Sequence, residues 1–152
     1  EGISRSDDAG ASWTSINSNL PVPTLGIPRI LEVDTQAPAT VYASIGEGMY
    51  KTTDGGGSWS PISTGLPEPS DFRAIAIDPV HPNRLFVGSE GFFSEGFVYG
   101  TGNSGASWSS LTADIQNPGI EWLTIDPTGS GAVYAATKSS GRTTEAPIAL
   151  DG

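Results

Sequence analysis

The chain has 152 residues, of which 36% are hydrophobic and only 16% are charged, and its 20 glycines and 12 prolines favour short strands joined by tight turns. The formal net charge of −10, with seven Lys and Arg residues, excludes a phosphate-neutralising surface, so nucleic acid is not an expected partner. The absence of Cys excludes disulfides and thiolate metal sites, and the lack of a long apolar run predicts no membrane insertion.

The first predicted elements are a strand over residues 2–5, a glycine-rich corner over residues 6–13 and a returning strand over residues 13–16. Close copies of this corner stand at residues 52–59 and 101–108. Their tryptophans, Trp13, Trp59 and Trp108, are 46 and 49 residues apart. A repeat of this length is typical of propellers and solenoids.

The residue types that recur in the corner have a physical explanation. An Asp at the start of a tight turn can accept backbone N–H bonds, and Gly supplies the positive φ that the turn demands. The Trp then enters the next strand and lays its ring over the turn, with its indole N–H free to find a carbonyl. Each copy therefore predicts a self-stabilised hairpin corner.

Further strands are expected between the corners. Alternating strands over residues 30–34, 74–78 and 122–126 each end in Asp, and shorter strands follow over residues 41–43, 85–87 and 133–135. The predicted unit thus has four strand positions, A to D, which in the first complete unit pass through Leu31, Tyr42, Tyr50 and Trp59. The corner joins C to D.

The corner resembles the Asp-box, S/T-x-D-x-G-x-S/T-W, of the bacterial neuraminidase (BNR) repeat in sialidase-like and xyloglucanase-like β-propellers. Residues 6–13 and 52–59 match it fully, whereas the third copy has Asn103 in place of the Asp. The resemblance implies an all-β fold of propeller blades, each with four antiparallel strands. It suits a non-catalytic member of the family or a fragment.

About three blades fit in this length, whereas a closed propeller usually has about four to eight. Either two chains complete a six-bladed ring, or the chain continues in a longer array, which we favour. We expect residues 1–136 to hold the repeats, as strands C and D of one blade, two full blades, and strands A and B of another. Residues 137–152 are expected to form an irregular C-terminal extension.

Acids that recur once per repeat suit turn architecture better than chemistry. These recurring residues are Asp8, Asp54, Asn103, Asp34, Asp78 and Asp126.

Candidate ligand-binding residues are instead those that break the repeat. In one such segment, residues 89–96, Phe92 and Phe93 lie between Glu90 and Glu95. The aromatic rings could stack on a sugar while the carboxylates bond its hydroxyls. Alternatively, one Phe fills a gap and the glutamates are solvated.

A second set of candidates stands at the start of strand position A. Arg29, Arg73 and Glu121 each lie five residues before a repeated Asp, yet they differ from one another. If strand A is innermost, as the resemblance implies, they would ring the axial channel on the face of the Phe92–Phe93 loop. A solvated rim is the alternative reading.

The residues give less support to an enzymatic function. Sialidases carry an F/Y-R-I-P motif, but this chain has only Ile-Pro-Arg-Ile at residues 27–30. A glycoside hydrolase needs two carboxylates about 5–10 Å apart, and no spacing singles out a pair among Asp71, Glu90, Glu95 and Glu121. The lone His81 is a predicted turn residue. We therefore expect no catalytic residues, no metal and no cofactor.

The sequence favours a non-catalytic, extracellular or cell-surface module for binding or structural assembly. Its expected partners are a carbohydrate, a protein or a second copy of the chain. One alternative is a glycoside hydrolase fragment in which Glu90, Glu95 or Glu121 acts as acid or nucleophile. The other is a subunit of a surface filament or layer, joined through free strand edges.

Overall fold

The computed structural model describes residues 2–21, 26–67, 71–90, 97–111 and 119–138. Within these ranges the chain forms twelve strands and no helix, so it contains no helix long and apolar enough to cross a membrane. The predicted division between repeats and an extension at residues 137–152 stays a prediction, because residues 139–152 lie outside the described ranges.

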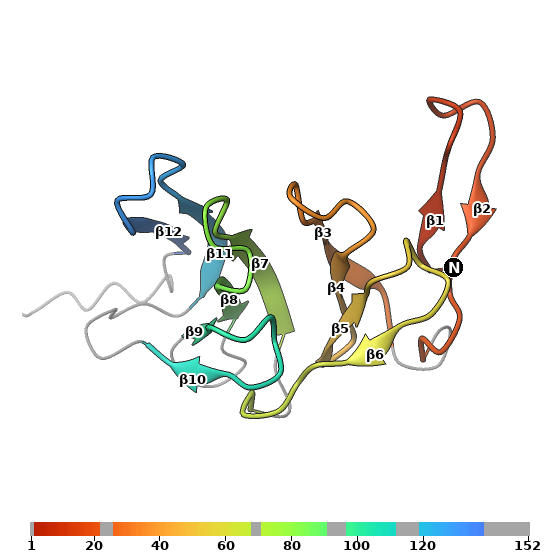
Figure 1. The fold of residues 1–152 in the computed structure, drawn as a ribbon. Coiled ribbons are helices and arrows are strands. Elements are labelled where there is room, and N and C mark those ends of the chain that lie inside the picture. Colours follow the sequence, from red (N-terminus) through yellow and green to blue (C-terminus); the bar gives the residue numbers. More distant parts are fainter. Residues whose placement is uncertain (1, 22–25, 68–70, 91–96, 112–118, 139–152) are drawn as a thin grey trace, which may run out of the picture.

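The strands form four antiparallel sheets that follow one another along the chain (Figure 1). The first is a hairpin of β1 (Ser4–Arg5) and β2 (Thr14–Ser15). Two four-stranded sheets follow: β3 (Pro28–Val33), β4 (Val41–Ile45), β5 (Gly48–Thr52) and β6 (Ser60–Pro61), then β7 (Asp71–Ile77), β8 (Leu85–Glu90), β9 (Val98–Thr101) and β10 (Ser109–Ser110). The last is a hairpin of β11 (Ile120–Ile125) and β12 (Val133–Thr137). The predicted fold class, all-β blades of four antiparallel strands, is confirmed.

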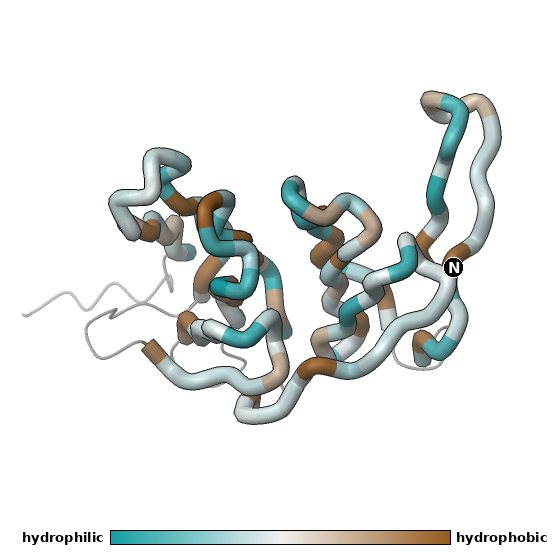
Figure 2. Tube along the Cα trace, viewed as in Figure 1, coloured by the Kyte–Doolittle hydropathy of each residue, from teal (hydrophilic) through white to brown (hydrophobic). Residues whose placement is uncertain are grey.

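The hydrophobic core is divided into layers between successive sheets. One layer joins Tyr42 and Met49 of the first four-stranded sheet to Phe72 and Leu85 of the second. Another packs the second sheet against β11, and a third packs the N-terminal hairpin against β4. Figure 2 shows the same division, with hydrophobic residues along the inner strands and hydrophilic ones at turns such as that between β1 and β2. Each sheet is therefore stabilised mainly by its neighbours.

The hairpin corners have the hydrogen bonds that their sequence predicts. Asp54 Oδ1 accepts a bond from the Ser58 backbone N–H at 2.9 Å, and Oδ2 accepts one from the Ser58 hydroxyl at 2.9 Å. Asp8 accepts the equivalent bonds from Ser12. Asn103 keeps the backbone bond through its amide oxygen, which lies 3.0 Å from the Ser107 nitrogen. The third corner thus keeps the fold of the motif without its charge.

The tryptophans act between blades, which corrects the expectation that each corner stabilises itself. The indole N–H of Trp59 donates to the Ile16 carbonyl, and that of Trp108 donates to the Ile62 carbonyl, both at 2.7 Å. Ile16 directly follows β2 and Ile62 directly follows β6, which are the D strands of the preceding sheets. Both indole rings are buried. Trp13, whose corner meets no preceding sheet, is 67% exposed.

The corners are expected to make the fold sensitive to acid. Hydrogen bonds from Ser12 lower the pKa of Asp8 to about 2, and those from Thr52 and Ser58 lower the pKa of Asp54 to about 2. A carboxyl with a depressed folded-state pKa stabilises the fold above its ordinary pKa, and this contribution is lost as the pH falls from about 4 to about 2. Changing both residues to Asn, as at Asn103, should therefore reduce the fall in melting temperature over this range. Thermal unfolding followed by circular dichroism at several pH values measures the fall, and an equal fall in both proteins would contradict the prediction.

Candidate functional site

Three of the predicted site residues share one structural position. Arg29, Arg73 and Glu121 lie at β-bulges near the starts of β3, β7 and β11, where the pairing register with the neighbouring strand shifts. A bulge leaves one residue unpaired and re-aims its side chain. These three side chains therefore fall outside the regular pattern in which every second side chain of a strand faces the core.

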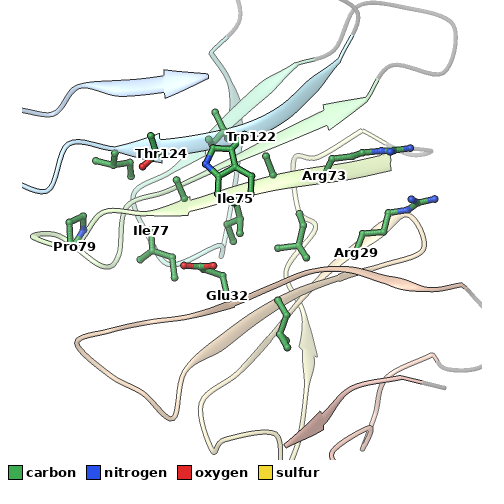
Figure 3. Close-up of a pocket in the computed structure, with 14 residues that line it drawn as sticks. Arg29, Glu32, Arg73, Ile75, Ile77, Pro79, Trp122 and Thr124 are labelled. Carbon is green, nitrogen blue, oxygen red and sulfur yellow. The ribbon is translucent and has the colours of Figure 1, made fainter. Parts of the chain in front are cut away.

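Asp71 brings the two arginines together. Its Oδ2 lies 2.8 Å from Arg73 Nη2, and its Oδ1 lies 3.0 Å from Arg29 Nε. The second contact is an ion pair without hydrogen-bond alignment, because Oδ1 has no aligned donor among the described residues. The Asp71 side chain is only 7% exposed, so both cations are held against a nearly buried anion. Figure 3 shows Arg29 and Arg73 extending from neighbouring strands toward the same end of the groove.

Glu90 extends this network to the last sheet. It forms an ion pair with Arg73, and its Oε1 lies 3.1 Å from Lys138 Nζ. The hydrogen bond from Lys138 lowers the pKa of Glu90, with help from the charges of Arg73 and Lys138, against the opposing effect of burial. The side chain is therefore held as a carboxylate.

Glu121, like Asp71, has one carboxylate oxygen without a hydrogen-bond partner among the described residues. Its Oε1 is buried, with no hydrogen-bond donor among the described residues. Its charge still reaches Arg73. Burial lowers the pKa of that guanidinium, but the hydrogen bond and charge of Asp71 and the charges of Glu90 and Glu121 outweigh it and raise the pKa overall.

We call these six residues the mouth cluster: Arg29, Asp71, Arg73, Glu90, Glu121 and Lys138. Three are basic and three acidic, so the cluster is formally neutral, whereas the whole chain carries −10. A neutral cluster that mixes donors and acceptors is suited to hydroxyl and amide groups. It is poorly suited to a strongly charged ligand.

A groove of about 390 Å³ adjoins the mouth cluster and is lined by β3, β7 and β11 (Figure 3). Leu31 and Trp122 line it and are 52% and 69% exposed. Glu32 also lines the groove, and partial burial raises the pKa of its carboxyl. The groove therefore offers apolar surface beside hydrogen-bonding groups, the usual composition of a ligand site.

The other predicted residues fall into two groups. Phe92, Phe93 and Glu95 lie outside the described residues, so their role stays a prediction. The repeated acids of the A–B turns accept backbone N–H bonds, as Asp78 does from Val80 and His81 at 2.9 and 3.0 Å, in keeping with an architectural role. No cluster of three metal-ligating side chains occurs in the part of the chain that the structure describes.

Two members of the cluster were not singled out by the sequence. Asp71 stood only among the available acids, although it lies two residues before Arg73 and so on the same side of an extended strand. Lys138 was assigned to the irregular tail. It directly follows β12, at the position that corresponds to Glu90 one sheet earlier, and this correspondence was the available signal.

No family model and no curated protein matches the chain. Among solved structures, an ancestral GH74 enzyme matches with a TM-score of 0.69 and 20% identity, over 89% of this chain and 19% of that one. A GH74 enzyme from Niastella koreensis matches with a TM-score of 0.66 and 19% identity, over 90% of this chain and 25% of that one. YCF48 bound to D1 peptide matches with a TM-score of 0.52 and 20% identity, over 79% of this chain and 39% of that one.

These likenesses establish the fold. The neighbours are β-propellers, and the present chain spans about a fifth to a quarter of the length of the GH74 chains. Sequence identities near 20% support a shared fold but not a shared function. The chain is therefore a run of β-propeller blades that carries a neutral cluster of charged side chains near the ends of neighbouring strands.

Proposed function

We propose that this chain is a run of Asp-box blades of an extracellular β-propeller, and that it binds a carbohydrate or protein partner at the mouth cluster without catalysing a reaction. The corner hydrogen bonds at Asp8, Asp54 and Asn103 support the assignment to Asp-box repeats. The proposed surface consists of the mouth cluster and the adjoining groove, and the contribution of Phe92, Phe93 and Glu95 to it stays a prediction from the sequence.

The observation that carries the proposal is the contrast between a repeated framework and a non-repeated cluster. Turn acids and corner tryptophans recur from blade to blade, whereas bulge positions hold Arg29, Arg73 and Glu121 in turn. Repeat proteins commonly place ligand contacts on such variable positions of a constant scaffold. Among these variable side chains, those of Arg29 and Arg73 are 46% and 30% exposed and are thus accessible to a ligand hydroxyl or amide.

The charge state of the cluster favours binding over hydrolysis. A glycosidase general acid requires a raised pKa, so that the carboxyl is protonated near neutral pH. The pKa of Glu90 is instead lowered by Lys138 and Arg73. Glu90 is therefore a poor proton donor and a good anchor for the arginine.

A glycoside hydrolase fragment is the second candidate function. It is favoured by the likeness to GH74 enzymes and by the closeness of Glu90 and Glu121 to one arginine. The likeness to YCF48 bound to D1 peptide supports a peptide ligand instead. Because the chain spans a small part of the GH74 chains, a complete active site would need residues from outside it.

The test is a screen of the 152-residue chain against immobilised glycans and peptides, followed by isothermal titration of the best ligand. We expect Arg73→Ala to weaken binding about ten-fold or more, because it removes a charged hydrogen-bonding group of the surface. Glu121→Gln should weaken binding in the same direction, because the charge of Glu121 acts on Arg73. His81→Gln is the matched control, since this 64% exposed side chain lies on an A–B turn and outside the cluster. Equal affinity of all four proteins would contradict the proposed surface.

The same preparations distinguish the two candidate functions. Incubation with a polysaccharide panel is expected to release no reducing sugar from any substrate. Release by the parent chain that is abolished by Glu90→Gln or Glu121→Gln would overturn the non-catalytic proposal and favour the hydrolase.

A further inference from the structure

Glu32 is the only acidic side chain among the described residues that line the groove, and it breaks the repeat. Glu32 pairs with Tyr42 of β4 just as Ala76 pairs with Phe86 of β8, so Glu32 and Ala76 occupy the same place in successive sheets. Ala76 is 7% exposed and packs in a core layer, whereas Glu32 is accessible from the groove. A carboxylate therefore stands where the next sheet has a core residue.

The Glu32 carboxylate has no ion-pair or hydrogen-bond partner within the described ranges. Figure 3 shows it in the space between β3 and β7, beside Ile77. Ile75 and Ile77 line the groove with it and are half-buried against the core layer between the two four-stranded sheets. Partial burial raises the pKa of Glu32, because a charge that is removed from water without a partner is disfavoured. A cationic group in the groove would supply the missing partner.

The groove also exposes the free backbone edge of β7. This strand ends its sheet and pairs only with β8 among the described strands. The Asp78 N–H donates to the Arg84 carbonyl at 3.0 Å, so the two-residue repeat directs the N–H and C=O groups of Ile75 and Ile77 away from β8. These groups face the groove, which both residues line. An extended peptide can pair with them as an added strand.

The charged groups of the groove are separated along its length. Arg29 and Arg73 lie at the mouth end, and Glu32 lies farther along β3 (Figure 3). Arg29 and Glu32 are three residues apart, which corresponds to about 10 Å of extended strand. The charges of the mouth cluster cancel, so the whole net charge of −10 lies outside it. This charge favours a cationic group over an anionic one beside Glu32.

We propose that the groove binds an extended peptide as an added strand on β7, and that Glu32 selects a Lys or Arg side chain of that peptide. Every second side chain of such a strand points toward β3, where Glu32 lies. Peptide carbonyls farther along the strand accept from Arg29 and Arg73 at the mouth. A carbohydrate has no backbone with this repeat of donors and acceptors, so the strand edge favours a peptide. This inference rests on the proposed function, because it specifies the partner of the same surface.

The test is a positional-scanning peptide library, with peptides of about seven residues to match the length of β7. In each pool the central residue is fixed as Lys, Arg, Gln or Glu, and the other residues are randomised. The immobilised 152-residue chain should retain the Lys and Arg pools about five-fold more than the Gln pool. Glu32→Gln should still retain peptides, but with a ratio of about one. A parent chain without preference for basic pools would overturn the proposal.

Glu47→Gln is the matched control, because it removes the same charge from an exposed side chain that does not line the groove. The overall charge of −10 attracts any basic pool, and both variants lower it equally. Glu47→Gln should therefore keep the parent's ratio of Lys to Gln pools. An equal fall of this ratio in both variants would assign the preference to overall charge and overturn the role of Glu32.

The backbone pairing is tested on the best-retained peptide. Two versions carry N-methyl groups on alternate residues, one on the odd and one on the even positions. Only every second N–H of an added strand bonds to β7, so one version should lose affinity about ten-fold or more, and the other less than about three-fold. Equal losses in the two versions would overturn the added strand.

Immobilised glycans, tested in parallel, separate this inference from the proposed function. Retention of a glycan without retention of any peptide pool would overturn the peptide proposal and leave the proposed binding surface standing. A chain that retains neither peptides nor glycans would overturn both. Retention of basic pools that Glu32→Gln alone makes unselective would support both.

Discussion

Replacement of Trp108 by alanine is expected to lower the free energy of unfolding by roughly 3–5 kcal/mol, the usual cost of truncating a large buried aromatic side chain. Trp108 is 6% exposed and lies in the core layer between the two four-stranded sheets. Its indole N–H also donates to the Ile62 carbonyl at 2.7 Å, and the alanine variant leaves that acceptor without its donor. A loss of this size is a large part of the total stability of a domain, so the variant should unfold at much lower urea concentration.

Two further variants separate the causes. Trp108→Phe keeps most of the apolar ring and removes the indole donor, so it should cost roughly 1–2 kcal/mol. Trp13→Ala alters the same motif at a site that is 67% exposed, so it should change stability by less than about 0.5 kcal/mol. Equal losses at Trp13 and Trp108 would show that the corner acts within its own hairpin and not between blades.

The contrast between these tryptophans shows what local sequence can and cannot predict. The repeat located the strands and corners, because turn residues and alternating strands act through neighbours in sequence. The burial of Trp13 was not predictable from its motif, which matches that of Trp59. Its environment is set by whether another sheet precedes it, and that is a property of the array.

The candidate site was less accessible to sequence reasoning for a similar physical reason. Arg29, Arg73 and Glu121 were identified because they vary at a constant position, but the bulges that re-aim them leave no separate mark in the sequence. The bond between Glu90 and Lys138 joins residues 48 positions apart, at the end of β8 and directly after β12. Such pairs become visible only when the stacking of sheets is known.

The connector between blades contains a glycine that is expected to be nearly as sensitive as Trp108. Gly65 has a φ of 88°, and a Cβ at this position would clash with the Trp108 carbonyl oxygen. Gly65→Ala should therefore cost roughly 2–4 kcal/mol, from a left-handed backbone that alanine disfavours and from displacement of a backbone group. The displaced group belongs to the junction where the Trp108 N–H donates to the Thr64 carbonyl at 3.0 Å.

The sequence echo between residues 19–21 and 65–67 supports this reading, since Asn19 occupies the corresponding position with a φ of 65°. Asparagine tolerates this region better than alanine, so Gly65→Asn should cost less than Gly65→Ala. Gly102→Ala is the matched control, because a Cβ there meets no atom within 4 Å and its φ is not positive, and its stability should stay within about 0.5 kcal/mol of the parent's. Urea unfolding of the three variants measures these differences.

Because Gly65 and Trp108 act at one junction, combining Gly65→Ala with Trp108→Ala should destabilise the chain by less than the sum of the two losses. An additive result would place the two residues in independent parts of the fold.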